Sequence, residues 1–222
     1  MPDSQTATVP PSKHLAFQFE DLEQQHTTST FGMWIFLATE VLFFGALFTG
    51  YLVYRNLYHR AWVEASTLGM QYWKGTTNTV VLICSSLTMA MGVHSAQVGK
   101  RKLLVLFLVL TMILGCTFLT IKGFDYHKEY VEHHIPGPNF SFPESTDARH
   151  AELFFSLYFI MTGLHTLHMV IGVGVVAVIA WLGWKGHYGP EYYNPVENVG
   201  LYWHFVDIVW IFLYPLLYLV SQ

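Results

Sequence analysis

Five long stretches of almost unbroken apolar residues divide the chain, with shorter polar segments between them. The first, from Phe31 to Tyr54, reads FGMWIFLATEVLFFGALFTGYLVY and is long enough to cross a bilayer as a helix. The others cover residues 78–98, 103–124, 151–181 and 200–220. This pattern predicts an all-α fold, a polytopic membrane bundle of five transmembrane helices in residues 31–222, preceded by a polar N-terminal segment of residues 1–30.

A single carboxylate, Glu40, interrupts the first apolar stretch. At about 1.5 Å rise per residue it lies roughly 13 Å below Phe31, near the middle of a hydrocarbon core about 30 Å thick. An acid at that depth costs at least about 2.5 kcal/mol, so it should face protein or water and be either protonated or paired. We therefore predict that Glu40 is a buried functional carboxylate.

The other apolar stretches carry small or polar residues at helical spacing, each set on one side of its expected helix. Such residues let membrane helices approach closely, so these sides are expected to face the bundle. They are Asn78, Ser85 and Gly92; Thr111, Gly115 and Lys122; Thr162, His165, His168 and Gly172; and His204, Asp207, Ile211 and Tyr214. The predicted buried polar network consists of His165, His168, His204 and Asp207.

Two pairs of charged residues allow more than one interpretation. Asp207 lies one turn from His204, which fits a proton relay, but structural ion pairs have the same spacing and a self-neutralising pair is the expectation. Lys122 and Asp125, near the end of the third stretch, are expected to reach the interface and pair there.

Histidines suggest haem or metal sites, but their spacing favours neither. His165 and His168 lie one turn apart on one helix and cannot clasp a single haem between them, so hydrogen bonding is the expected role of the histidines in the spans. The segment between the third and fourth stretches has further metal-capable side chains that match no zinc pattern. They are His127, Glu132, His133, His134 and His150. No metal site is predicted.

Composition supports a membrane protein and excludes other classes. Of the 222 residues, 53% are hydrophobic and 12% charged, whereas a soluble domain has about 25% charged residues. The net charge is −4 and no basic block suggests nucleic acid. No segment has the pattern of a cleaved signal peptide, so the first apolar stretch is expected to be an anchor. Cys84 and Cys116 fall inside spans and are expected to be packing residues without a disulfide.

Basic residues indicate the orientation. Lys and Arg are nearly balanced between the two sides, but Lys100, Arg101 and Lys102 cluster in the short turn between the second and third spans. This cluster favours a cytoplasmic turn, which places the N-terminus inside the cell and the C-terminus on the outer side.

Three segments in order carry a family resemblance: Gly32-Met33 through Ala38-Thr39-Glu40-Val41-Leu42-Phe43-Phe44, then Thr162-Gly163-Leu164-His165-Thr166-Leu167-His168, then Tyr202-Trp203-His204-Phe205-Val206-Asp207-Ile208-Val209-Trp210. With Asn78-Thr79 opening the second span, the chain resembles subunit III of haem–copper cytochrome c oxidases, in the short five-helix bacterial form. The resemblance covers nearly all of the chain from about residue 30 onward.

The resemblance implies a non-catalytic subunit of the bacterial inner membrane, in a respiratory complex that couples oxygen reduction to proton pumping. Such a subunit packs against the catalytic subunit I and binds phospholipids, while haem and copper belong to partner subunits. The residue matching Glu40 is the reactive carboxylate of the family. Where longer relatives carry a basic residue for a lipid headgroup this chain has Leu182, and Lys185 is the candidate substitute.

Two alternatives remain at this stage. A quinol oxidase or a nitric oxide reductase has an equivalent subunit, and the resemblance leaves open whether the complex joins a respiratory supercomplex. A stand-alone ion transporter that uses Glu40 and the histidines belongs to a different class, and it is disfavoured because inverted repeats and broken-helix signals are missing.

Overall fold

The computed structural model describes residues 15–69, 72–138, 140–142 and 147–219. Over these residues the chain is almost entirely helical, which confirms the predicted fold class. The helices are α1 (Leu22–Leu57), α2 (His59–Glu64), a π-helical turn η1 (Ala65–Gly69), α3 (Tyr72–Gln97), α4 (Arg101–Val131), α5 (Ala148–Trp184) and α6 (Asn194–Tyr218).

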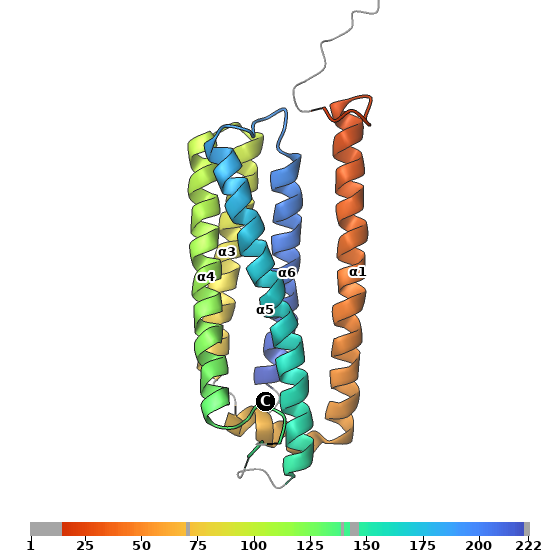
Figure 1. Ribbon diagram of the computed structural model, residues 1–222, viewed down its shortest axis with the longest axis vertical. Helices are drawn as coiled ribbons and strands as arrows, with labels where there is room; N and C mark the ends of the chain where they lie inside the picture. Colours follow the sequence, from red (N-terminus) through yellow and green to blue (C-terminus); the bar gives the residue numbers. More distant parts are fainter. Residues whose placement is uncertain (1–14, 70–71, 139, 143–146, 220–222) are drawn as a thin grey trace, which may run out of the picture.

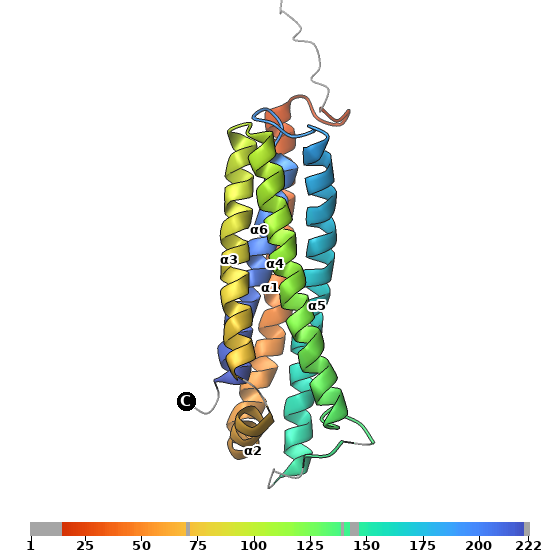
Figure 2. The same cartoon turned by 90° about the vertical axis from the view of Figure 1, so that its left-hand side faces the viewer.

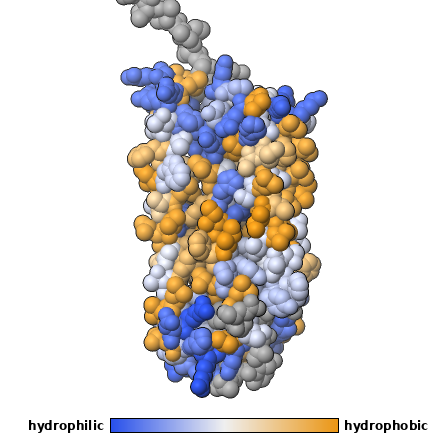
Figure 3. Space-filling view, turned by 180° about the vertical axis from the view of Figure 1, so that it is seen from behind, coloured by the Kyte–Doolittle hydropathy of each residue, from blue (hydrophilic) through white to orange (hydrophobic). Residues whose placement is uncertain are grey.

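Five of these helices are long and apolar enough to cross a membrane: α1, α3, α4, α5 and α6. They lie side by side along one axis, and the N-terminal end of α1, the α3–α4 turn and the α5–α6 loop gather at one end of the bundle (Figures 1 and 2). The short α2 and the α4–α5 connection lie at the opposite end (Figure 2). Seen from behind, hydrophobic side chains form a band along the bundle and hydrophilic ones gather at both ends (Figure 3).

The helix α6 is the centre of the bundle, and α1 is its most peripheral member. In the most apolar 18-residue stretch of each helix, half of the stretch is buried in α6 but only 11% in α1. Two tryptophans explain the position of α6, because each is buried and donates its indole N–H to a hydroxyl of α3. Trp203 donates to Ser85 and Trp210 to Thr79, both at 3.1 Å. Aromatic residues with a satisfied N–H are well suited to a bundle core.

The predicted inward faces of α3 and α4 are confirmed, and that of α5 holds except at His168, which is half-buried. Asn78, Ser85, Thr111 and Thr162 are fully buried within the bundle. The predicted face of α6 holds at Asp207, which is buried, but is wrong at Ile211, which is 47% exposed, and the two tryptophans also lie inside. The close approach of α6 to α4 depends on Gly115: an added Cβ there would lie 2.9 Å from the Trp203 ring.

Helix α4, which corresponds to the third predicted span, is longer than that span. It continues through Asp125 and ends at Val131, and the chain then turns at His133, whose φ of 59° is left-handed. The amide of His134 then donates to the Glu129 carbonyl at 3.0 Å, the six-to-one bond of a Schellman C-cap. This cap folds His134 back against the end of α4, where the residue is buried.

Candidate functional site

Glu40 on α1 faces His168 on α5 near the middle of both helices. The Glu40 Oε2 and the His168 Nε2 are 3.3 Å apart, and the two side chains are 19% and 15% exposed. The His168 ring also contacts Phe44, with ring centroids 5.4 Å apart, and the Tyr202 hydroxyl donates to the His168 carbonyl. The acid that the sequence placed at mid-membrane depth therefore has a specific partner.

The second ring nitrogen of His168 determines how many protons this pair holds. His168 Nδ1 lies 2.8 Å from the Leu164 carbonyl, which can only accept, so Nδ1 carries a hydrogen. The contact between Nε2 and Glu40 then needs one more proton, located on either group. With that proton the pair has no net charge, whether it is a neutral acid beside a neutral imidazole or a carboxylate beside an imidazolium. This meets the cost of an acid in hydrocarbon.

The other predicted polar residues do not join this pair. His204 Nδ1 lies 2.7 Å from the Ser86 hydroxyl of α3. Asp207 is 3% exposed, and its carboxyl group interacts with the Ser86 hydroxyl of α3 rather than with His204. The expected pairing of Asp207 with His204 is therefore wrong, because His204 turns to α3 instead.

His165 is also separate from the pair. It is fully buried, and neither ring nitrogen has a hydrogen-bond partner among the described residues. Its ring packs against Phe118 and Trp210, with centroids 5.5 and 5.3 Å away. The expected structural hydrogen bond of His165 is absent from the described part of the chain. Although His165 and His168 lie three residues apart on one side of α5, their rings have different neighbours: α4 and α6 for the first, α1 for the second.

The most elaborate charged site was not predicted. Lys122 is 1% exposed, so the expectation that it reaches the interface is wrong. Its Nζ lies 3.2 Å from the Tyr158 hydroxyl, 3.1 Å from the Tyr218 hydroxyl and 4.0 Å from Asp125. Four aromatic rings surround the ammonium with centroids 5.1–5.7 Å away: Tyr126, Tyr158, Trp210 and Tyr218. The sequence shows these tyrosines in three separate helices, but it does not show that they meet around Lys122, because this depends on how the helices pack.

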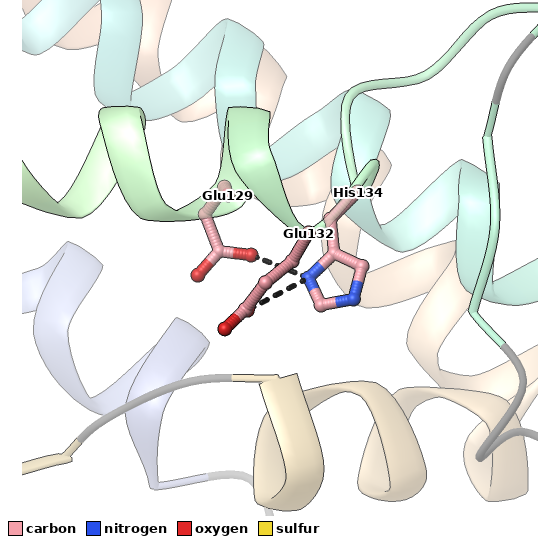
Figure 4. Close-up of side chains that lie close together, drawn as sticks. All are labelled: Glu129, Glu132 and His134. Carbon is pink, nitrogen blue, oxygen red and sulfur yellow. Dashed lines mark hydrogen bonds and ion pairs between the residues drawn. The ribbon is translucent and has the colours of Figure 1, made fainter.

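A cluster at the end of α4 has metal-capable chemistry. One ligand atom each from Glu129, Glu132 and His134 lie within 4.8 Å of one another (Figure 4). His134 Nδ1 is 2.7 Å from Glu129 and 3.7 Å from Glu132. The ammonium of Lys128 lies 3.2 Å from Glu132 and 3.9 Å from Glu129, so a positive charge is already provided. The arrangement is satisfied as an ion-pair cluster, and we assign no metal to it.

Two features of the surface suit lipid. An apolar cavity of about 450 Å³ lies between α1 and α6, lined by side chains that include Val41, Phe48 and Phe212. At the end of α5, the Lys185 ammonium lies over the Trp181 ring, 3.6 Å from its centroid. An aromatic ring and a basic side chain at a helix end are typical of a membrane–water interface. Both cysteines are free thiols on exposed positions.

Known proteins resemble this chain over most of its length. The family model for cytochrome c oxidase subunit III matches residues 17–222. The Gallus gallus protein named cytochrome c oxidase subunit 3 is 30% identical over 217 residues, covering 90% of this chain and 74% of the relative. The Synechocystis protein of the same name is 31% identical over 191 residues, covering 86% of this chain and 75% of the relative. The Thermostichus vulcanus protein of the same name is 29% identical over 192 residues, covering 86% of this chain and 87% of the relative.

Proposed function

The chain belongs to the cytochrome c oxidase subunit III family, and on this premise we propose that it is a supporting subunit that stabilises the catalytic subunit I of a proton-pumping oxidase. It forms no active site of its own. Haem and copper are held by partner subunits, and this chain contributes helix packing, lipid binding and a buried acid. Membership of the family already implies a multi-pass membrane protein of respiratory electron transport that associates with other oxidase subunits.

The Glu40–His168 pair is the observation that carries this proposal. A proton carrier needs a path on both sides, whereas this acid is held by one histidine, and that histidine is fixed by the Leu164 carbonyl. The pair joins α1 to α5, two helices that otherwise make few contacts. Its role is therefore to hold α1 in place at mid-membrane depth, and so to keep the surroundings of subunit I intact during turnover.

Phospholipid belongs to the same proposal. The apolar cavity between α1 and α6 accepts an acyl chain, because its described lining offers almost no hydrogen-bonding group. Lys185, beside Trp181, lies at the level where a headgroup phosphate is found and provides the positive charge for it. The lipid thus fills space beside α1, the helix that the protein itself covers least.

The orientation follows from the basic residues. Arg101 donates its Nε–H to the Gly183 carbonyl at 3.2 Å, which brings the Lys100–Lys102 turn next to the end of α5 and to Lys185. Both basic groups therefore occupy one end of the bundle (Figure 1). We propose that this end, with the N-terminus, is cytoplasmic in a bacterial inner membrane, and that the C-terminus lies outside.

One purification tests the assignment. The protein is solubilised gently from its native membrane with an affinity tag, and the co-purifying subunits, haems and lipids are identified. The proposal expects subunits with a-type haem and copper, and bound phospholipid. Isolation of the chain without any oxidase subunit would contradict it. Quinol turnover with b- and o-type haems would instead favour the equivalent subunit of a quinol oxidase.

A further inference from the structure

A polar pocket lies at the end of the bundle opposite to Lys185. It has a volume of about 530 Å³ and lies between the C-terminal end of α1 and the first turns of α5, whereas Lys185 follows the last turn of α5. Figure 2 shows this end of α5 at the same end of the bundle as α2. The pocket is lined by Tyr58, Arg149, His150, Glu152, Leu153 and Ser156.

The depth of this pocket corresponds to the lipid headgroups. The hydrocarbon core ends about 15 Å from the middle of a bilayer, and the headgroups extend to about 22 Å. Counted along α5 from the mid-membrane His168 at about 1.5 Å per residue, Ser156 lies about 18 Å and Glu152 about 24 Å from the middle. Ile160, one turn nearer the middle than Ser156, is 49% exposed and offers apolar surface to an acyl chain. A phospholipid can therefore reach the pocket with its headgroup while its chains stay in hydrocarbon.

The polar groups of the pocket are held in place by neighbours. The Tyr58 ring stacks on the His150 ring with centroids 3.7 Å apart, and Nδ1 of His150 lies 2.5 Å from Asp147. The Glu152 Oε1 accepts a hydrogen bond of 3.0 Å from the Gly137 amide. Tyrosine is enriched at membrane–water interfaces. A ligand that binds here meets ordered groups, which reduces the entropic cost of binding.

The pocket presents a cation and an anion to a ligand. Arg149 is exposed, and a planar guanidinium pairs with the oxygens of a phosphate in bidentate geometry. The Glu152 carboxylate accepts from Gly137 and, with about four lone-pair sites, can accept further hydrogen bonds. A headgroup that carries both a phosphate and an ammonium finds a partner for each charge. A headgroup with a net negative charge would instead be repelled by Glu152.

From this arrangement we infer that the pocket binds the headgroup of a zwitterionic phospholipid with a primary ammonium, as in phosphatidylethanolamine. Arg149 pairs with the phosphate, and Glu152 accepts from the ammonium. A primary ammonium has N–H donors for a carboxylate, whereas the quaternary ammonium of phosphatidylcholine has none. The inference rests on the lipid-binding part of the proposed function and deepens it, because it assigns a second lipid to the leaflet opposite to that of Lys185.

Photo-crosslinking in the reconstituted complex tests the ligand. The oxidase complex that contains this chain, with a photoreactive residue in place of Leu153, is placed in nanodiscs with equal amounts of phosphatidylethanolamine and phosphatidylcholine. Mass spectrometry then identifies the lipid adducts. We expect phosphatidylethanolamine adducts to exceed phosphatidylcholine adducts about fivefold. A photoreactive residue at Ile113, exposed on α4, is the control and should give similar amounts of both. Equal adducts at Leu153 would overturn the inference.

Substitutions in the pocket separate headgroup recognition from folding. Glu152→Gln keeps an oxygen that accepts from the Gly137 amide but loses the negative charge, so the preference for phosphatidylethanolamine should disappear. Glu191→Gln, an exposed acid in the α5–α6 loop at the other end, is the matched control and should keep the preference. Arg149→Gln should reduce the adducts of both lipids about threefold, because both carry a phosphate. An unchanged preference in an assembled Glu152→Gln complex would overturn the inference.

A soluble competitor distinguishes a lipid from a free ligand of the same chemistry. Glycerophosphoethanolamine has the same headgroup without acyl chains, and at the concentration of the lipid it should leave the Leu153 adducts unchanged. Abolition of the lipid adducts by this competitor would overturn the assignment to a lipid. Failure of the proposed function has a different signature, since the chain would purify without oxidase subunits before any crosslinking.

Discussion

Glu40 of α1 and His168 of α5 contact each other near the middle of both helices, with the Glu40 Oε2 and the His168 Nε2 3.3 Å apart. Because His168 already donates Nδ1–H to Leu164, only one hydrogen remains for the contact with Glu40. The pair is neutral with the proton on either atom. With this partner, an acid in the middle of an apolar helix is compatible with hydrocarbon, and its most direct effect is on the attachment of α1.

Glu40→Gln should leave the initial rate of the oxidase near normal. The amide of the glutamine still donates to His168 Nε2, so α1 remains attached. Turnover is expected not to require a proton route through this pair. We expect faster inactivation during prolonged turnover or altered lipid content, followed by oxygen consumption over time and by lipid analysis. Immediate, complete loss of activity in an assembled complex would instead indicate an obligatory proton carrier.

Replacing one member of the Glu40–His168 pair should lower the stability of the protein more than replacing both. His168→Leu leaves Glu40 buried without a partner and should lower stability by about 1–3 kcal/mol. Glu40→Leu combined with His168→Leu should recover part of that loss, because no unsatisfied polar group remains. A double-mutant cycle of detergent unfolding measures the coupling. Additive losses would show that the contact contributes nothing.

Lys122→Met should destabilise the protein by about 2–4 kcal/mol. Loss of the ammonium leaves two tyrosine hydroxyls without a hydrogen-bond donor and four aromatic rings without a cation. Asp125 keeps a second partner, Lys74 at 3.0 Å, which limits the loss. Lys128→Met is the matched control, since this partly exposed lysine should cost less than about 1 kcal/mol. Thermal unfolding in one detergent compares the two. Equal effects would contradict a special role of the buried site.

Gly115→Ala should lower stability by about 1–3 kcal/mol, because the added methyl group would press against the rigid Trp203 ring at the α4–α6 contact. Gly123→Ala on the same helix is the control. An added Cβ there meets nothing within 4 Å, so the change should be neutral or stabilise by up to about 1 kcal/mol. Unfolding curves of the two variants provide the comparison, and a harmless Gly115→Ala would show that α6 can move away.

The cap of α5 should respond to acid. The His150 ring, 2.5 Å from Asp147, and the His150 amide hold the pKa of the Asp147 carboxyl below its ordinary value. A lowered folded pKa means that the stabilisation is complete above the unfolded pKa of about 3.9 and is lost as pH falls through the folded value. Backbone amide hydrogen exchange at the first turn of α5 should therefore increase as the pH falls through the folded pKa of Asp147. Asp147→Asn keeps an acceptor for the cap and should lack this acid response.

The helices could be predicted because a span has to be long and apolar, and both properties are local. The depth of Glu40 follows from the same count of residues. Its partner could not be predicted: four spans offer polar side chains, and the choice of His168 over His165 depends on how α5 is rotated against α1. That rotation is a property of packing between helices distant in the sequence.

The errors on α6 and α4 have a similar cause. The polarity pattern assigned Ile211 to the core, whereas Trp203 and Trp210, large aromatic side chains with a hydroxyl partner, determine the inward face. Lys122 was expected at the interface because an isolated lysine is costly in a bundle. Tyrosines from α5 and α6 remove that cost, and only the folded chain brings them together.

The separation of Glu40 from His168 along the chain also sets an order of events during synthesis. More than a hundred residues lie between them, so at about 5–20 residues per second α1 is complete on the order of ten seconds before its partner is made. During that interval the His168 imidazole is not yet available to Glu40. The attachment of α1 is thus a late step of biogenesis, since α5 and α6, the long helices that it contacts, are both made after it.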